Sequence, residues 1–152
     1  MEKPTDELNE LLRNTKPGQL DQYFQDNEEY MELDEKAFYD FMTNTLKKKR
    51  IKKADVYSFA CVSESYGGQI MRMEKHTRDR DLILRFCIAG HFTWDETNKA
   101  LKLYKMNELY SKDGRDACIL YALNNRIYSM DEIDQILAQK GYKKITPEDD
   151  AD

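Results

Sequence analysis

The stretch SESYGGQIMRMEKHTRDRD, Ser63 to Asp81, decides how the middle of the chain folds. Its apolar residues recur at helical spacing, but Gly67 and Gly68 interrupt the pattern, and a glycine inside a helix costs roughly 0.5–1 kcal/mol relative to alanine. The stretch fits the second helix of a helix-turn-helix, with its polar side offered to the DNA major groove, or an ordinary amphipathic helix. The glycine pair favours a lengthened turn or a close approach of the backbone to a phosphate or a packed neighbour.

The segments on either side predict further short helices. Apolar spacing predicts helices at Lys53 to Cys61, at about Ser65 to Lys75 and at Arg78 to Ala89, with a turn at Val62-Ser63. Two short helices around a tight polar turn, with a third helix packed across both, form the arrangement of a helix-turn-helix.

Toward the N-terminus the pattern predicts three more helices. The first two, Thr5 to Arg13 and Leu20 to about Glu29, are separated by the Lys-Pro-Gly sequence at 16–18. The third begins at Asp34 as N-cap and carries an apolar stripe that we assign to the core: Phe38, Phe41, Met42 and Leu46.

Toward the C-terminus two capping boxes predict helix starts, Thr93-Trp-Asp-Glu96 and Ser129-Met-Asp-Glu132. The boxes are 36 residues apart, and the helix pair at Arg78 to Tyr104 is loosely repeated at Gly114 to Lys140. Because a solenoid usually needs at least three repeats, we expect one compact helical layer added to another.

Composition predicts an all-α protein: 35% of the 152 residues are charged and 40% hydrophobic, with three prolines and six glycines. We expect a repressor-like helix-turn-helix core with additional N- and C-terminal helices. The expected divisions are an N-terminal helical arm at 1–33, the core at 34–106, a C-terminal helical extension at 107–145 and a disordered acidic tail at 146–152. No apolar run reaches the roughly 20 residues that span a bilayer, so we expect a soluble, cytoplasmic protein without membrane contact.

Nothing in the sequence indicates catalysis or a cofactor. Cys61, Cys87 and Cys118 are an odd number, lie far apart among apolar neighbours, and are expected to be reduced core residues. Cys87 and His91 share a helical face but lack a second pair of ligands, so no metal site is predicted. No glycine-rich phosphate loop or nucleophile pair is present, and we expect a protein that is not an enzyme.

Charge is distributed unevenly along the chain. The net charge is −5, yet Thr45 to Asp81 holds ten basic and five acidic residues, a net +5, which leaves −10 elsewhere. The segment KKKRIKK, Lys47 to Lys53, concentrates six cations in seven residues, a density that suits phosphates. The alternative is a solvated helix end, where cations also complement the helix dipole.

Residues Lys52 to about Tyr104 resemble the phage-repressor-like (XRE) helix-turn-helix family. The resemblance is carried by SFACVS at 58–63, MEKHTRDRDLIL at 73–84 and FTWDETNKALKLYKM at 92–106. LYSKDGRDACILYAL at 109–123 is similar to an extension in a divergent branch from low-GC Gram-positive bacteria. The resemblance implies a bacterial DNA-binding transcription regulator.

Two departures from the family pattern affect DNA reading. Eleven positions separate Ser63 from Glu74 where the family usually has eight, so the family's base-reading positions do not transfer directly. The glycine expected after the glutamate step is His76, so another residue must make the left-handed helix cap or the cap is lost.

Under the hypothesis that the chain binds DNA, its partner is double-stranded DNA and two sets of residues make the contacts. Side chains that hydrogen-bond to base edges would be Glu64, Ser65, Gln69, Arg72 and Lys75. Side chains that hold phosphate would be Lys48, Lys49, Lys52 and Lys53. In the alternative reading all of these are solvated surface, and the chain is an all-helical module that has lost DNA readout and binds a protein partner. A homodimer fits either reading, and palindromic DNA sites favour it.

Overall fold

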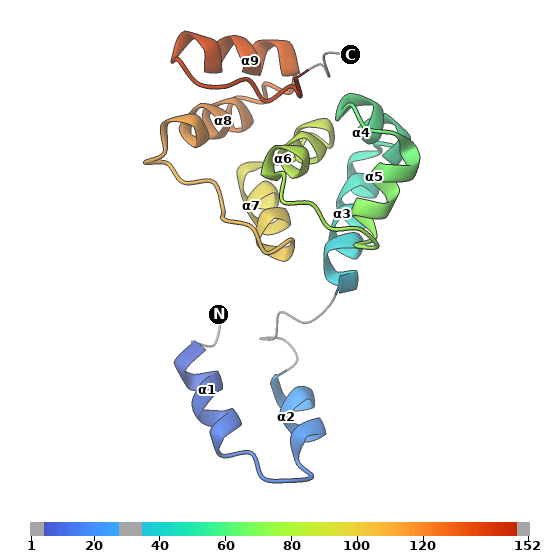
Figure 1. The fold of residues 1–152 in the computed structure, drawn as a ribbon, viewed down its shortest axis with the longest axis vertical. Coiled ribbons are helices and arrows are strands. Elements are labelled where there is room, and N and C mark those ends of the chain that lie inside the picture. Colours follow the sequence, from blue (N-terminus) through green and yellow to red (C-terminus); the bar gives the residue numbers. More distant parts are fainter. Residues whose placement is uncertain (1–4, 28–34, 149–152) are drawn as a thin grey trace. The chain divides into compact units, whose positions relative to one another are not determined.

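The computed structural model describes residues 5–27 and 35–148, and within them the chain is all-helical, with no strand (Figure 1). The helices are α1 (Thr5–Arg13), α2 (Leu20–Asn27), α3 (Glu35–Lys49), α4 (Lys53–Phe59), α5 (Glu64–Met71), α6 (Arg80–Ala89), α7 (Trp94–Leu103), α8 (Gly114–Asn124) and α9 (Met130–Gln139). The chain divides into two compact units, Met1–Leu33 and Asp34–Asp152, and we call the described part of the second unit the body.

The first unit is a hairpin of α1 and α2. Its turn contains Gly18 with φ 85°, a backbone conformation that glycine adopts without strain. Helix α1 has the predicted bounds, whereas the predicted end of α2 near Glu29 lies outside the described residues. The hairpin leaves large apolar side chains in solvent, namely Leu11, Leu12, Leu20 and Phe24.

The body consists of α3 followed by three helical hairpins, α4–α5, α6–α7 and α8–α9. The second hairpin lies between the other elements: α6 contacts α4, and α7 contacts both α3 and α8 (Figure 1). One hydrophobic core runs through all of it and includes Phe38, Met42 and Leu46 of the predicted α3 stripe, while Phe41 is half-buried. The predicted Asp34 cap lies outside the described residues.

The second and third hairpins repeat each other in contacts as well as in sequence. Asn98 Oδ1 accepts the Leu109 N–H at 2.9 Å, and 36 residues later Asp134 Oδ1 accepts the Ile145 N–H at 2.7 Å. Each bond ties the segment after a hairpin back to the hairpin's second helix. Thr146, expected in the tail, is also hydrogen-bonded to Asp134.

Each body helix from α3 to α9 ends in the same way. A residue with positive φ follows the helix, and the next N–H bonds to the carbonyl five residues earlier, as in a Schellman motif. The seven residues with positive φ are Arg50, Cys61, Met73, His91, Lys105, Arg126 and Gly141. Only one of them is glycine, so six of these turns hold a side chain in the strained left-handed region.

These turns correct two expectations and resolve a third question. Helix α5 ends at Met71 rather than at Lys75, because Met73 has φ 61° and reverses the chain. Met73 is also the residue that makes the left-handed cap, which the sequence had left open between another residue and a lost cap. Cys61 is exposed rather than buried, because it occupies the left-handed position between α4 and α5. Cys118 is half-buried against the core, and Cys87 is buried as expected.

Helix starts follow the predicted caps more closely. At Thr93 both bonds of the capping box are present, and at Ser129 the hydroxyl accepts the Glu132 N–H, one half of the predicted box. Helix α6 begins two residues later than predicted, because Asp79 is its N-cap and accepts the Leu82 N–H.

Two ion pairs join the second hairpin to the third in a crossed arrangement. Arg80 pairs with Asp116 at 2.8 and 2.9 Å, and Arg115 pairs with Asp81 at 2.8 Å through both nitrogens. Each arginine therefore bonds the aspartate that follows the other arginine in sequence. Burial raises the pKa of Asp116, but hydrogen bonds from Arg80 and the Tyr110 N–H outweigh it and hold this pKa below its ordinary value.

The same two arginines also hold the segments that follow α7 and α9. Arg80 donates to the carbonyls of Asn107 and Glu108, and Arg115 donates to those of Lys143 and Lys144. Since a guanidinium offers five N–H groups in a fixed plane, one arginine can bind a carboxylate and a loop together.

Among the described residues, no helix is long and apolar enough to cross a membrane.

Replacing Lys105 by glycine should raise the free energy of unfolding by about 0.5–1 kcal/mol, because a left-handed side chain costs roughly 1–2 kcal/mol and glycine removes that cost at the expense of a more flexible unfolded chain. Lys105 has φ 60° and is exposed, so little packing is lost. Chemical denaturation followed by circular dichroism measures the change.

The matched control is Gln135→Gly, at an exposed position in the middle of α9. Glycine there should lower the stability by roughly 0.5–1 kcal/mol, because the helix gains no relief of strain. Destabilisation of the same size by both substitutions would contradict the assignment of strain to the turn.

Candidate nucleic-acid interface

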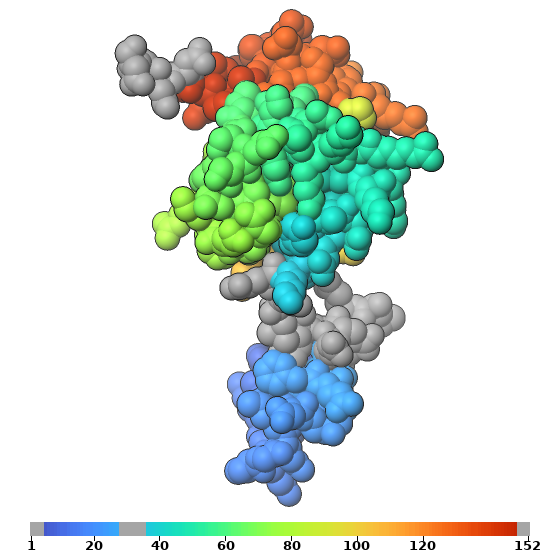
Figure 2. All heavy atoms as spheres, turned by 90° about the vertical axis from the view of Figure 1, so that its right-hand side faces the viewer, coloured from blue at the N-terminus to red at the C-terminus, as the bar shows by residue number. Residues whose placement is uncertain are grey.

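Helices α4 and α5 form the hairpin that the sequence marked as a helix-turn-helix. Residues 60–63 connect them, and Ser63 is the N-cap of α5, its hydroxyl accepting the Tyr66 N–H at 3.1 Å. Helix α5 packs on α3 and α4, and α6 packs on α4. In Figure 2, the C-terminal part of α3 and the α4–α5 hairpin, cyan to green, lie together on one face of the body.

The two glycines of α5 have different roles. A Cβ on Gly67 would lie 2.4 Å from Cδ1 of Tyr57, so this glycine lets α5 approach the buried ring of α4. The atoms nearest to a Cβ on Gly68 would be those of the Arg72 guanidinium, with Nη1 at 2.9 Å. Gly67 is therefore explained by a packed neighbour, and Gly68 gives room for Arg72 to lie across the helix.

The predicted base-reading residues are not all on one helix. Glu64 and Ser65 are exposed in the first turn of α5, and Gln69 is half-buried one turn later. Arg72 is the C-cap and Lys75 lies beyond the helix, because the chain reverses at Met73. The expectation that α5 carries all five residues is wrong for these last two.

Arg72 forms an ion pair with Glu74, which follows it closely in the turn after α5. Its Nε donates to Glu74 Oε1 at 2.8 Å and its Nη2 to Oε2 at 3.2 Å, a bidentate pair with both side chains about half exposed. The hydrogen bond to Arg72 lowers the pKa of Glu74, so the carboxylate is ionised near neutral pH.

The four predicted phosphate lysines fall into two groups. Lys48 and Lys52 are exposed, Lys48 in the last turn of α3 and Lys52 as the N-cap of α4. Lys49 pairs with Glu96 of α7 at 2.9 Å, and Lys53 donates to the Tyr39 hydroxyl at 3.0 Å. Lys49 is thus already neutralised by a carboxylate, whereas Lys48, Lys52 and Lys53 have no anionic partner among the described residues.

Tyr39 is a member of the site that sequence reasoning missed. It lies on α3, in contact with Lys53 through both its hydroxyl and its ring, whose centroid is 4.1 Å from Nζ. Hydrogen bonding and charge from Lys53, with a further contribution from Arg72, lower the pKa of the Tyr39 hydroxyl. Tyr39 and Lys53 are 14 residues apart and belong to different helices, so no local pattern in the sequence predicts their contact.

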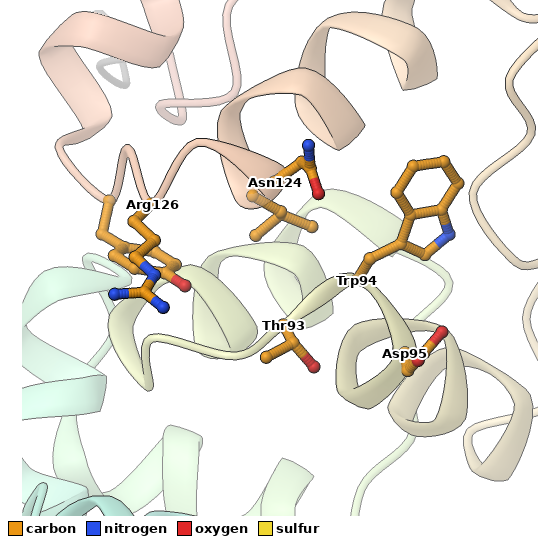
Figure 3. Close-up of a pocket in the computed structure, with 7 residues that line it drawn as sticks. Thr93, Trp94, Asp95, Asn124 and Arg126 are labelled. Atoms are coloured by element: carbon orange, nitrogen blue, oxygen red, sulfur yellow. The ribbon is translucent and has the colours of Figure 1, made fainter.

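A shallow pocket of about 300 Å³ lies away from this hairpin, between the start of α7 and the end of α8 (Figure 3). Trp94 and Arg126 mark its opposite ends, and the other lining residues are Thr93, Asp95, Leu123, Asn124 and Tyr128. Two of its polar groups serve the fold: the Thr93 hydroxyl caps α7, and the Tyr128 hydroxyl donates to the Phe92 carbonyl. These two contacts indicate that the residues around the pocket hold the start of α7 and the segment after α8 in place.

Comparison with protein-family models, curated proteins and solved structures finds no match to this chain. The XRE resemblance therefore stays a prediction.

Gly67→Ala should destabilise the protein by about 1–3 kcal/mol, because the new methyl overlaps the ring of Tyr57 in a packed interface. Gly68→Ala is the matched comparison, since its methyl meets only the end of a flexible side chain. It should be neutral or stabilising by up to about 1 kcal/mol, the difference in helix propensity. Urea unfolding of both variants measures the contrast, and equal losses would refute the separate roles.

Proposed function

We propose that this chain is a DNA-binding transcription regulator of a bacterial cytoplasm, in which α5 enters the major groove and lysines on either side of the α3–α4 turn hold the phosphate backbone. The observation that carries the proposal is the α4–turn–α5 hairpin, with α3 and α6 packed around it and an exposed first turn on α5. In helix-turn-helix proteins the N-terminal residues of the second helix contact base edges.

The residues at the start of α5 suit that role. Glu64 and Ser65 are exposed, and Gln69 follows Ser65 at a spacing of four, which places both on one face. Gln69 can bind adenine in a bidentate manner, and Glu64 can accept from cytosine. Reading would therefore come from the first two turns of α5.

Charge supports the same surface. A net charge of −5 disfavours indiscriminate binding to DNA, whereas the +5 between Thr45 and Asp81 directs any contact to the α3–α6 side. Exposed Lys48 and Lys52 stand on either side of the α3–α4 turn, where a phosphate backbone crossing the hairpin would pass them.

A protein-interaction module is the second candidate, and exposed aromatic side chains favour it. Among the described residues of the second and third hairpins and their connections, four large aromatics are 40% exposed or more: Trp94, Tyr110, Tyr121 and Tyr142. Aromatic residues are enriched at protein interfaces. A partner protein or a second copy of the chain could bind there, beside DNA or in its place.

Replacing Lys48 and Lys52 together by glutamine should weaken binding to every duplex alike and reduce the slope of log K against log salt by about 2, since each phosphate contact contributes roughly 0.9. Fluorescence anisotropy with a labelled random-sequence duplex, at salt concentrations between about 50 and 200 mM, measures both effects.

Lys140→Gln with Lys143→Gln is the control, because it removes the same charge from the end of the third hairpin. It should leave the slope unchanged. Absence of measurable wild-type affinity at low salt would overturn the DNA proposal and leave the interaction module as the better account.

A further inference from the structure

We propose that Arg72 is a ligand for a DNA backbone phosphate, shared with Lys53 and Tyr39, and that Glu74 occupies Arg72 as a built-in competitor until DNA displaces it. This inference rests on the DNA-binding function proposed above and assigns to Arg72 a different role from base reading. Four observations carry it.

The three proposed phosphate ligands, which we call the clamp, come from three elements of the body. Tyr39 comes from α3, Lys53 is the first residue of α4, and Arg72 is the C-cap of α5. Lys53 Nζ lies 3.0 Å from the Tyr39 hydroxyl, and α5 packs on both α3 and α4. The charge of Arg72 makes a small contribution to the lowered pKa of that hydroxyl. Two cations and a hydroxyl on one surface are the groups that bind a phosphate's oxygens.

The conformation of Arg72 fits this surface better than a groove. Its guanidinium lies back across α5 at Gly68, where Nη1 stands 2.9 Å from the position that a Cβ would occupy. An arginine that reads guanine must extend away from the helix toward a base edge. A side chain lying along the helix is positioned for the backbone of DNA beside it.

Glu74 presents to Arg72 the same two-oxygen geometry that a phosphate would. Nε and Nη2 bind Oε1 and Oε2 respectively, and guanidinium binds carboxylate and phosphate through the same bidentate fork. Both side chains are about half exposed, so water screens the pair and a stronger anion can replace the carboxylate.

The fold itself does not require a carboxylate at this position. Glu74 follows the left-handed residue after α5, and the six equivalent residues after the other body helices are all apolar or aromatic: Ile51, Val62, Phe92, Met106, Ile127 and Tyr142. An apolar residue there commonly packs against the preceding helix. Among the seven turns, this one alone carries a charged residue at that position, and the residue forms an ion pair with Arg72.

A double-mutant cycle on the full chain tests the competitor. Glu74→Gln should tighten binding to duplex DNA about three- to tenfold near 100 mM salt and steepen the salt slope by about one contact. In the Arg72→Gln background, Glu74→Gln should have little effect, because no guanidinium remains to be released. Equal tightening in both backgrounds would show general charge removal and overturn the proposal.

The kind of contact that Arg72 makes is tested with two unrelated duplexes, one AT-rich and one GC-rich. Arg72→Gln and Tyr39→Phe should each weaken binding by a similar factor on both duplexes. A loss with Arg72→Gln confined to the GC-rich duplex would identify base reading and refute the clamp. Inorganic phosphate substituted for chloride at equal ionic strength should compete only weakly; strong competition that requires Arg72 would identify a free-phosphate site instead.

Failure of this inference differs from failure of the proposed function. Binding by the wild type without tightening by Glu74→Gln overturns the competitor alone. Binding by neither the wild type nor Glu74→Gln overturns both. Circular dichroism should show the same helicity and melting temperature for each variant, since all but Tyr39 are exposed and Tyr39→Phe removes a single hydroxyl.

Discussion

The buried guanidinium of Arg85 is the constraint on which the arrangement of the body depends. It lies in α6 with 4% of its surface exposed, donates to the Ala60 carbonyl at 3.1 Å and to the Ile145 carbonyl at 3.0 Å, and stands 3.8 Å from Asp79. A buried charge is tolerated only when its donors are satisfied. The end of α4, the start of α6 and the segment after α9 must therefore be in place together. The helix-turn-helix turn, which begins at Ala60, is thereby fixed by residues 85 positions further along the chain.

Helix existence and helix starts could be predicted from the sequence, because their causes are local. Thr93, Ser129 and the apolar stripe of α3 carry their own signals within a few residues. Helix ends could not, since Met73 and Cys61 take a left-handed conformation usually given to glycine. No property of these side chains predicts the left-handed conformation, which the hydrogen bonds of the turn and the surrounding packing impose.

The candidate site also combines features that the local sequence predicts with features that depend on distant contacts. The density of lysines before α4 is visible in the sequence, but the engagement of Lys49 with Glu96 and of Lys53 with Tyr39 depends on contacts across 47 and 14 residues. Gly67 correctly indicated a close approach of the backbone to a neighbour, but the sequence did not identify that neighbour as the ring of Tyr57. The Arg-Asp dipeptides at 80–81 and 115–116 lie one position short of the 36-residue register, so the sequence repeat did not predict their pairing.

The crossed ion pairs between those dipeptides have a consequence for how the body opens. Because Arg80 and Arg115 each hold their own loop and the other's aspartate, neither the second nor the third hairpin can detach without exposing charged groups of both. We therefore expect these contacts to oppose the separate opening of either hairpin, so that α6 to α9 open as one cooperative unit. Their amide hydrogens would therefore exchange with solvent together, in a single slow event.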